Sequence, residues 1–203
     1  MSGIMVVRRI AICFALGVAA VLVLSAFAAP DADARKRNQP RINTISCPTF
    51  DGSPGTVCQG TNGRDLLIGT REANFILGRG GDDIYVSRGS NQDNNFPDVL
   101  VDSDEDSNDY YYFGDTPNIG VVFIDDAGGD SDTLDLRSYS TDDIADVDSA
   151  NRGGDPDELD LVITFNNGGR VVVFDYYGST DSETGSGFIE TIIFSDETFS
   201  GQA

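Results

Sequence analysis

The chain has 203 residues, of which 13 are Lys or Arg, 34 are Asp or Glu and none is His. Without His, the sequence excludes Ser-His-Asp and Cys-His catalysis, HExxH zinc proteases and imidazole metal ligands. A formal net charge of -21 argues against nucleic acids and anionic membranes as partners and favours cations. The 23 Gly and 7 Pro residues are typical of turn-rich β structure.

The N-terminal residues 1–28 have the organisation of a secretory signal peptide. Two arginines precede an apolar run from Ile10 to Phe27, which ends in the A-x-A cleavage pattern Ala26-Phe27-Ala28. We expect cleavage after Ala28 and a secreted, extracellular protein, with an uncleaved membrane anchor as the alternative. The basic stretch that follows predicts a flexible linker over residues 29–46.

The mature chain retains two cysteines, Cys47 and Cys58. An even pair in an exported protein predicts a disulfide, and two free thiols are the alternative. From residue 42 onward there are 7 Arg, no Lys and 32 Asp or Glu, which leaves a formal net charge of -25. The folded part is therefore expected to be more acidic than the whole chain.

A nine-residue repeat occupies residues 60–68, 69–77 and 78–86. Each copy begins with Gly, has Asp65, Asn74 or Asp83 at its sixth position, and ends in three apolar residues. This pattern predicts a turn of six residues followed by a strand of three. Because a nine-residue unit cannot bury its own apolar face, the copies are expected to stack.

The pattern resembles the glycine- and aspartate-rich nonapeptide repeat of the hemolysin-type calcium-binding (RTX) family. The second glycine of that repeat is replaced by Thr61, Thr70 and Arg79, and the fourth becomes Glu72 in the middle copy. The resemblance implies an all-β fold: a short parallel β-roll, or β-solenoid. In such a roll successive turns alternate between two sides, and calcium lies between turns i and i+2.

Carried onto this chain, the resemblance implies one calcium ion between turns 60–65 and 78–83. The carboxylates of Asp65 and Asp83 and the backbone carbonyls of both turns would form its oxygen shell. The implied ligands are Gly60, Asn62, Gly63, Asp65, Gly78, Gly80, Gly81, Asp82 and Asp83. Only a degenerate second site is expected, around Glu72 and Asn74. The alternative for the whole repeat is a Gly- and Asp-rich surface loop without metal.

Short apolar or aromatic runs recur between residues 99 and 136 and predict further strands. Their spacing suits either more coils of a solenoid or an antiparallel meander. The segment Asp102-Ser-Asp-Glu-Asp106 starts like an EF-hand loop, but Ser107 stands at its sixth position and Phe113 at its end. A solvated acidic turn or a weak exposed cation site is the preferred interpretation.

Two later segments are similar to regions that follow the repeats in the same family. Residues 125–140 resemble the closing segment of serralysin-type domains, which implies a further calcium at Asp125, Asp130 and Asp132; a hairpin turn is the alternative. Residues 154–199 resemble the C-terminal domain of hemolysin-type proteins, with strands at 159–165, 170–177 and 188–194. There this domain caps the roll. The aromatic residues expected in the cap core, rather than in a sugar-binding platform, are Tyr176, Tyr177, Phe188 and Phe194.

We therefore expect a secreted calcium-binding protein without catalysis, consisting of a signal peptide (1–28), a linker (29–46), a β-roll (47–140) and a β cap (141–203). Calcium would neutralise crowded carboxylates and link folding to ion binding. An extracellular adhesin or polysaccharide-binding matrix module with structural calcium is the alternative, and a glycosidase with paired carboxylates is a weaker one. The N-terminal signal departs from the C-terminal export of the family, and no zinc protease motif is present.

Overall fold

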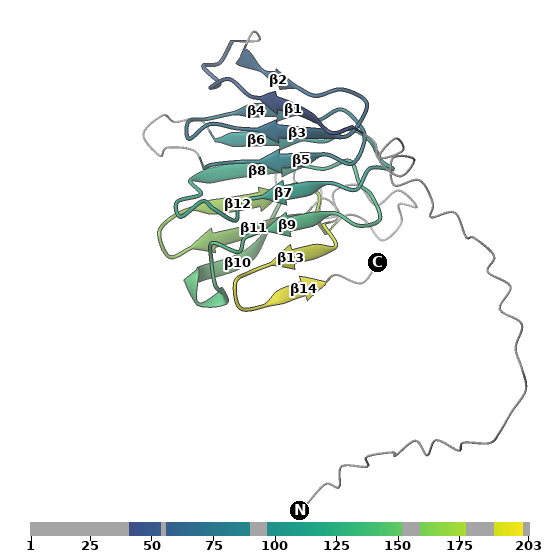
Figure 1. The fold of residues 1–203 in the computed structure, drawn as a ribbon. Helices are drawn as coiled ribbons and strands as arrows, with labels where there is room; N and C mark the ends of the chain where they lie inside the picture. The colour runs from purple at the N-terminus through teal and green to yellow at the C-terminus, as the bar shows by residue number, and fades with distance from the viewer. Residues whose placement is uncertain (1–40, 54–55, 90–96, 152–158, 178–188, 201–203) are drawn as a thin grey trace, which may run out of the picture. The chain divides into compact units, whose positions relative to one another are not determined.

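The computed structural model describes residues 41–53, 56–89, 97–151, 159–177 and 189–200 (Figure 1). All of them belong to one unit, Pro40–Ala203. The predicted signal peptide and most of the predicted linker lie outside the described residues. Within the described ranges, no helix has the length and apolar character needed to cross a membrane.

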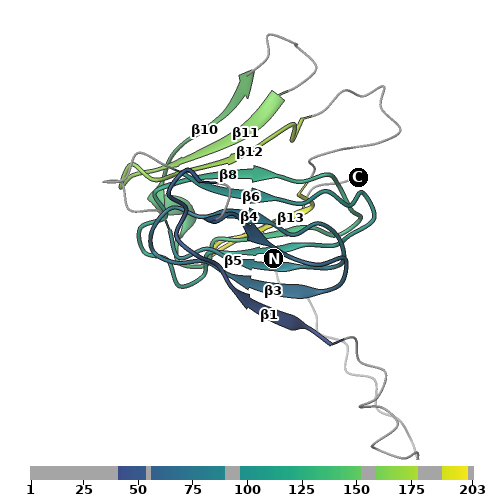
Figure 2. The same cartoon turned by 90° about the horizontal axis from the view of Figure 1, so that it is seen from above.

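The described residues form an all-β structure of two sheets, in which parallel pairs predominate. The first sheet has the order β1 (Asn43–Ser46), β3 (Asp65–Ile68), β5 (Ile84–Val86), β7 (Tyr110–Tyr112), β9 (Thr133–Asp135), β13 (Thr191–Ile193) and β14 (Thr198–Ser200). The second has the order β10 (Ile144–Asn151), β11 (Leu159–Phe165), β12 (Arg170–Val173), β8 (Val121–Asp125), β6 (Asp98–Val101), β4 (Phe75–Leu77) and β2 (Cys58–Gln59). Figure 2 shows the two sheets as separate layers.

Consecutive strands from β1 to β9 alternate between the two sheets and pair in parallel within each sheet. Side chains alternate in direction along a strand, so the middle residue of each apolar triplet points inward. Leu67, Tyr85, Tyr111 and Leu134 lie in register on neighbouring strands and are fully buried. The strands between residues 98 and 135 therefore continue the parallel pairing and do not form an antiparallel meander.

The C-terminal strands extend both sheets. The predicted hairpin is confirmed, since β11 pairs antiparallel with β12 around the turn at 166–169. However, β12 also pairs in parallel with β8, and β13 pairs in parallel with β9. The strand β10, which the sequence analysis did not predict, pairs with β11 at the sheet edge. Of the four aromatic residues expected in the cap core, Phe194 is buried, Tyr176 is half-buried, Tyr177 is exposed and Phe188 lies outside the described residues.

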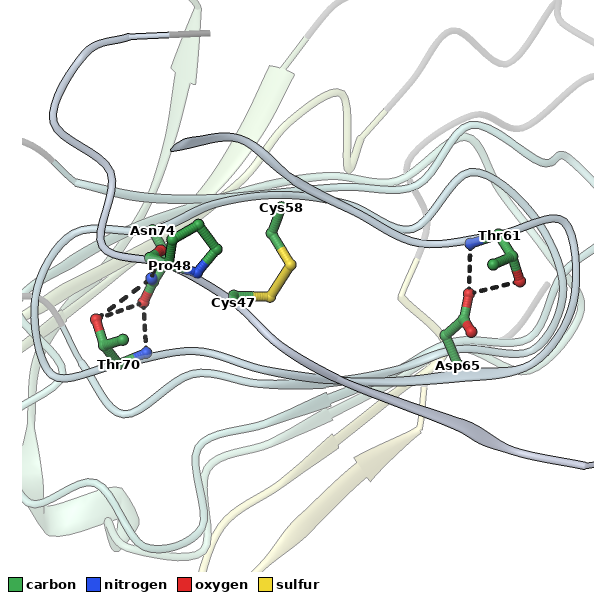
Figure 3. The surroundings of a disulfide bond; sticks show 7 residues. All are labelled: Cys47, Pro48, Cys58, Thr61, Asp65, Thr70 and Asn74. Atoms are coloured by element: carbon green, nitrogen blue, oxygen red, sulfur yellow. Dashed lines mark hydrogen bonds between the residues drawn. A yellow bond between two sulfur atoms is a disulfide. The ribbon is translucent and has the colours of Figure 1, made fainter. Parts of the chain in front are cut away.

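The N-terminal end of the stack is tied by a disulfide. The predicted bond between Cys47 and Cys58 is confirmed, with both side chains buried (Figure 3). Residues 43–46, which we expected in the linker, instead form β1, because their backbone pairs in register with residues 65–68. The bond joins the residue after β1 to the first residue of β2, and so connects the two sheets.

Candidate metal centre

Acidic side chains gather on the turns that lead from the second sheet to the first. Asp102 and Asp126 directly follow β6 and β8, while Asp83, Asp109 and Asp132 directly precede β5, β7 and β9. Because the strands stack in register, these positions fall into columns on one flank of the two sheets. We call these five residues the Asp cluster.

One column of the flank is held by hydrogen bonds from backbone to carboxylate. The backbone N–H of Asp65 donates to Asp83 Oδ1 over 2.8 Å, and that of Asp83 donates to Asp109 Oδ1 over 2.7 Å. The series continues from Asp109 N–H to Asp132 Oδ1 over 2.6 Å and from Asp132 N–H to Glu190 Oε2 over 2.5 Å. Each carboxylate thus satisfies a buried N–H at the start of the preceding strand of the sheet.

The Asp cluster forms two trios of carboxylates that share Asp109. Oxygens of Asp83, Asp102 and Asp109 lie within 4.8 Å of one another, as do those of Asp109, Asp126 and Asp132. All five residues are at most 3% exposed. Four of their buried oxygens have no hydrogen-bond partner, namely Asp83 Oδ2, Asp102 Oδ1, Asp126 Oδ2 and Asp132 Oδ2. Buried carboxylate oxygens without donors are costly, so the arrangement fits a bound cation.

Ser107 lies inside the first trio, where its hydroxyl is the nearest side-chain donor to two of the carboxylates. Its Oγ is 3.0 Å from Asp102 Oδ2, 3.1 Å from Asp109 Oδ2 and 2.8 Å from the backbone oxygen of Asp104. A serine hydroxyl has a single proton, so it can donate to only one of these three oxygens. The trio therefore brings together more oxygens than the available donors can satisfy.

Burial and mutual repulsion also raise the pKa values of the carboxyl groups in the Asp cluster. Burial raises the pKa of Asp109 to about 9, that of Asp132 to about 8 and that of Asp83 to about 7, and charges on neighbouring carboxylates add to the effect. Burial also raises the pKa of Asp126 to about 6 and raises that of Asp102. At neutral pH the five groups cannot all ionise unless a positive charge lies among them.

The structure places Asp65 and Asp83 on neighbouring turns, but their carboxylates differ in environment. Asp65 Oδ2 accepts hydrogen bonds from the N–H and the hydroxyl of Thr61 (Figure 3). Its Oδ1 accepts a hydrogen bond from Asn43. The two turns also pack directly, since a Cβ added at Gly60 would lie 2.4 Å from the carbonyl oxygen of Gly78. Asp65 thus has no unpaired buried oxygen to offer to an ion.

None of the remaining residues of the predicted site between the two turns adds a buried carboxylate beside Asp83. Asn62 and Asp82 are exposed, and Asp82 Oδ1 accepts a hydrogen bond from the N–H of Asn108. Gly63 and Gly81 contact each other through their backbones, and a Cβ at Gly80 would meet the carboxylate of Asp104.

The second predicted group, Asp125, Asp130 and Asp132, is not brought together. Asp132 is fully buried, whereas Asp125 and Asp130 are exposed. Asp125 ends β8 and points away from the core, because side chains alternate along the strand. The inward neighbour Asp126 joins Asp132 instead.

The middle repeat turn, 69–74, closes without a carboxylate cluster. Asn74 Oδ1 accepts the backbone N–H of Thr70 over 2.9 Å, and Asn74 Nδ2 donates to the carbonyl oxygen of Pro48 over 2.8 Å (Figure 3). Thr70 and Asn74 thus repeat on one flank the contact that Thr61 and Asp65 make on the other. This turn offers neutral hydrogen bonds rather than the degenerate metal site considered from the sequence.

The sequence analysis placed Asp102 in a solvated acidic turn or weak exposed site, whereas the structure buries it, and it did not single out Asp109 or Asp126. A usable signal existed for Asp109, which precedes the aromatic triplet 110–112 as Asp65 and Asp83 precede theirs. In the described residues, the cluster contains only carboxylate and hydroxyl oxygens, which suits a hard divalent cation.

Comparison with known proteins adds no evidence for or against a metal centre. No protein-family model matches the chain, and no curated protein matches it either. The case for a metal centre therefore stands on the buried, unpaired oxygens of the Asp cluster.

Proposed function

We propose that this chain is a secreted calcium-binding β-roll protein without catalytic activity, in which calcium holds successive turns of the roll together. The observation that carries the proposal is the set of four buried carboxylate oxygens without partners in the two trios. The alternating parallel strands and the partial nonapeptide repeat support the β-roll assignment. The N-terminal signal sequence and the disulfide support export.

Calcium fits the Asp cluster better than other cations do. The chain has no His, and its two mature cysteines are bonded to each other, so soft or borderline metals lack their usual ligands. Calcium accepts about 6–8 oxygens in a flexible geometry, whereas magnesium needs a near-ideal octahedron and retains its waters. Each trio draws its three carboxylates from two successive turns, and such a site favours the more tolerant ion.

The charge of the Asp cluster favours two ions rather than one. Five ionised carboxylates carry a charge of -5, which one Ca²⁺ reduces to -3 and two reduce to -1. We infer one ion among Asp83, Asp102 and Asp109 and a second among Asp109, Asp126 and Asp132. Asp109 would then bridge both ions, and three successive turns of one flank would be crosslinked.

The proposed role of the ions is to stabilise the folded chain. A ligand that binds only the native state adds about 2.7 kcal/mol at a hundredfold excess over its Kd. Without calcium, repulsion among the buried carboxylates opposes compaction. Extracellular calcium would thus favour the folded form after export.

The proposal is tested on the mature protein, residues 29–203, by calorimetric titration with calcium and by thermal unfolding with calcium or chelator. We expect about two ions per chain and a higher melting temperature in calcium, with a much smaller effect of magnesium. No heat of binding, together with identical unfolding curves in calcium and chelator, would overturn the proposal.

A further inference from the structure

A pocket of about 460 Å³ lies among the turns that lead from the first sheet to the second, on the flank opposite the Asp cluster. Three successive turns of this flank contribute to it, at 69–74, 87–89 and 113–120. Its volume falls within the range of about 300–1,000 Å³ that is common for small-molecule sites. Its polar and aromatic lining includes Arg71, Arg88, Tyr112, Asp115, Thr116 and Asn118.

The floor of this pocket is preformed. Thr116 Oγ1 donates a hydrogen bond to the carbonyl oxygen of Ser87 over 3.1 Å, and both residues are at most 3% exposed. Gly89 adopts a φ of 80°, and a Cβ added to it would lie 2.2 Å from the carbonyl oxygen of Asn118. The turns at 87–89 and 116–118 are therefore in direct contact, and a ligand would meet a shaped surface.

The charge of this pocket runs against that of the molecule. From residue 42 onward the chain has 7 Arg against 32 acidic residues, yet Arg71 and Arg88 both line this one pocket. The ion pair found among the described residues joins Arg137 to Asp135, and neither pocket arginine has a hydrogen-bond or ion-pair partner in that part of the chain. Guanidinium groups bind carboxylates and phosphates in bidentate fashion, so this pair favours an anionic ligand.

The other lining groups narrow the ligand class. Tyr112 is half-buried and offers an aromatic surface for the C–H groups of a sugar ring. Asn118 and the carboxylate of Asp115 suit the hydroxyl groups of a polyol. Because Asp115 also repels compact multivalent anions, phosphate and sulfate are poorer ligands than a singly charged, hydroxyl-rich molecule.

We propose that the pocket lined by Arg71, Arg88 and Tyr112 binds a carboxylate-bearing sugar, such as a uronate unit of an acidic polysaccharide. The carboxylate would face the two guanidinium groups, and the sugar ring would lie against the tyrosine. The site shares no residue with the Asp cluster, so it does not depend on the calcium proposal.

The test is a titration of the mature protein with sodium glucuronate in saturating calcium, followed by NMR or calorimetry, with glucose and sulfate as comparison ligands. We expect saturable binding of glucuronate, and weaker binding of glucose and sulfate by at least tenfold. The double variant Arg71→Gln/Arg88→Gln should lose at least tenfold in affinity, because both charges are removed. The control variant Arg170→Gln, which changes an exposed arginine outside the pocket, should bind as the wild type does.

The outcomes separate the two proposals. Absence of glucuronate binding, equal binding of glucose or sulfate, or unchanged affinity in the double variant would each overturn the sugar site. Calcium binding by the double variant should remain at the wild-type level, because the two substituted positions lie on the flank opposite the Asp cluster. If calcium does not bind, the glucuronate titration still tests the sugar site by itself.

Discussion

Asp109 is the residue on which the proposed calcium centre depends most, because both trios share it. The substitution Asp109→Asn removes one negative charge and keeps the shape of the side chain. The amide oxygen of the new side chain can still accept the 2.7 Å hydrogen bond from the N–H of Asp83. The fold therefore retains its backbone contact while each trio loses a ligand.

The expected magnitude follows from the linkage between binding and folding. Two ions at a hundredfold excess over Kd stabilise the wild type by about 5 kcal/mol, which corresponds to roughly 10–20 °C in melting temperature for a domain of this size. We expect Asp109→Asn to lose most of this gain in calcium. In chelator the same variant should be as stable as the wild type or more stable, because an amide removes the free-energy cost of burying or protonating this carboxylate.

Thermal unfolding by circular dichroism, with calcium and with chelator, measures both values. Asp130→Asn is a matched control: it makes the same chemical change on the next turn of the same flank, but its side chain is exposed. We expect the control to change stability by no more than about 0.5 kcal/mol in either condition. Equal destabilisation of Asp109→Asn with and without calcium would refute the metal centre and leave Asp109 a structural role only.

Three further predictions follow from the same contacts. In chelator, the free energy of unfolding should fall as pH rises from 3.8 to about 9, because the raised pKa of Asp109 makes the folded state bind the proton more tightly than the unfolded state. Calcium should therefore stabilise the protein more at pH 8 than at pH 5, which urea unfolding at the two pH values measures. Gly78→Ala should cost about 1–3 kcal/mol in urea unfolding, because its Cβ would lie 1.9 Å from the hydroxyl oxygen of Tyr85; an unchanged midpoint would contradict the packing. Reduction of the bond between Cys47 and Cys58 should lower the free energy of unfolding by about 2–3 kcal/mol, and a melting temperature independent of reductant would contradict this.

The part of the fold that the sequence predicted is the part with a constant period. Over residues 60–86 the turns have equal length, so the apolar triplets could be predicted from spacing, and the alternation of sheets was implied by the resemblance to the RTX repeat. The adjacency of Asp65 and Asp83, which are 18 residues apart, was implied by the same resemblance. In contrast, β10 escaped prediction because its alternating small and acidic residues lack an apolar run.

The Asp cluster escaped prediction because the turns vary in length while the strands keep their register. Consecutive carboxylates of the backbone-bonded column are 18, 26 and 23 residues apart, so a nine-residue period detects only the first pair. Asp102 and Asp126 are hidden for a second reason. They stand in the register position that Gly60 and Gly78 hold in the earlier coils, where the repeat leads one to expect glycine.

That exchange of glycine for aspartate explains why the buried carboxylate oxygens without partners concentrate in the middle of the stack. At the N-terminal end, Asp65 meets a glycine-led turn, and Thr61 supplies enough donors to satisfy its carboxylate. Further along, Asp102 and Asp126 replace the glycines. Each accepts one backbone N–H, from Asp104 and Gly128 respectively, and each keeps a second buried oxygen without a partner. Hydrogen bonds and a disulfide thus connect the first turns. The turns around Asp109 instead hold buried carboxylates that no ion pair of the described residues neutralises, which is why we propose a cation there.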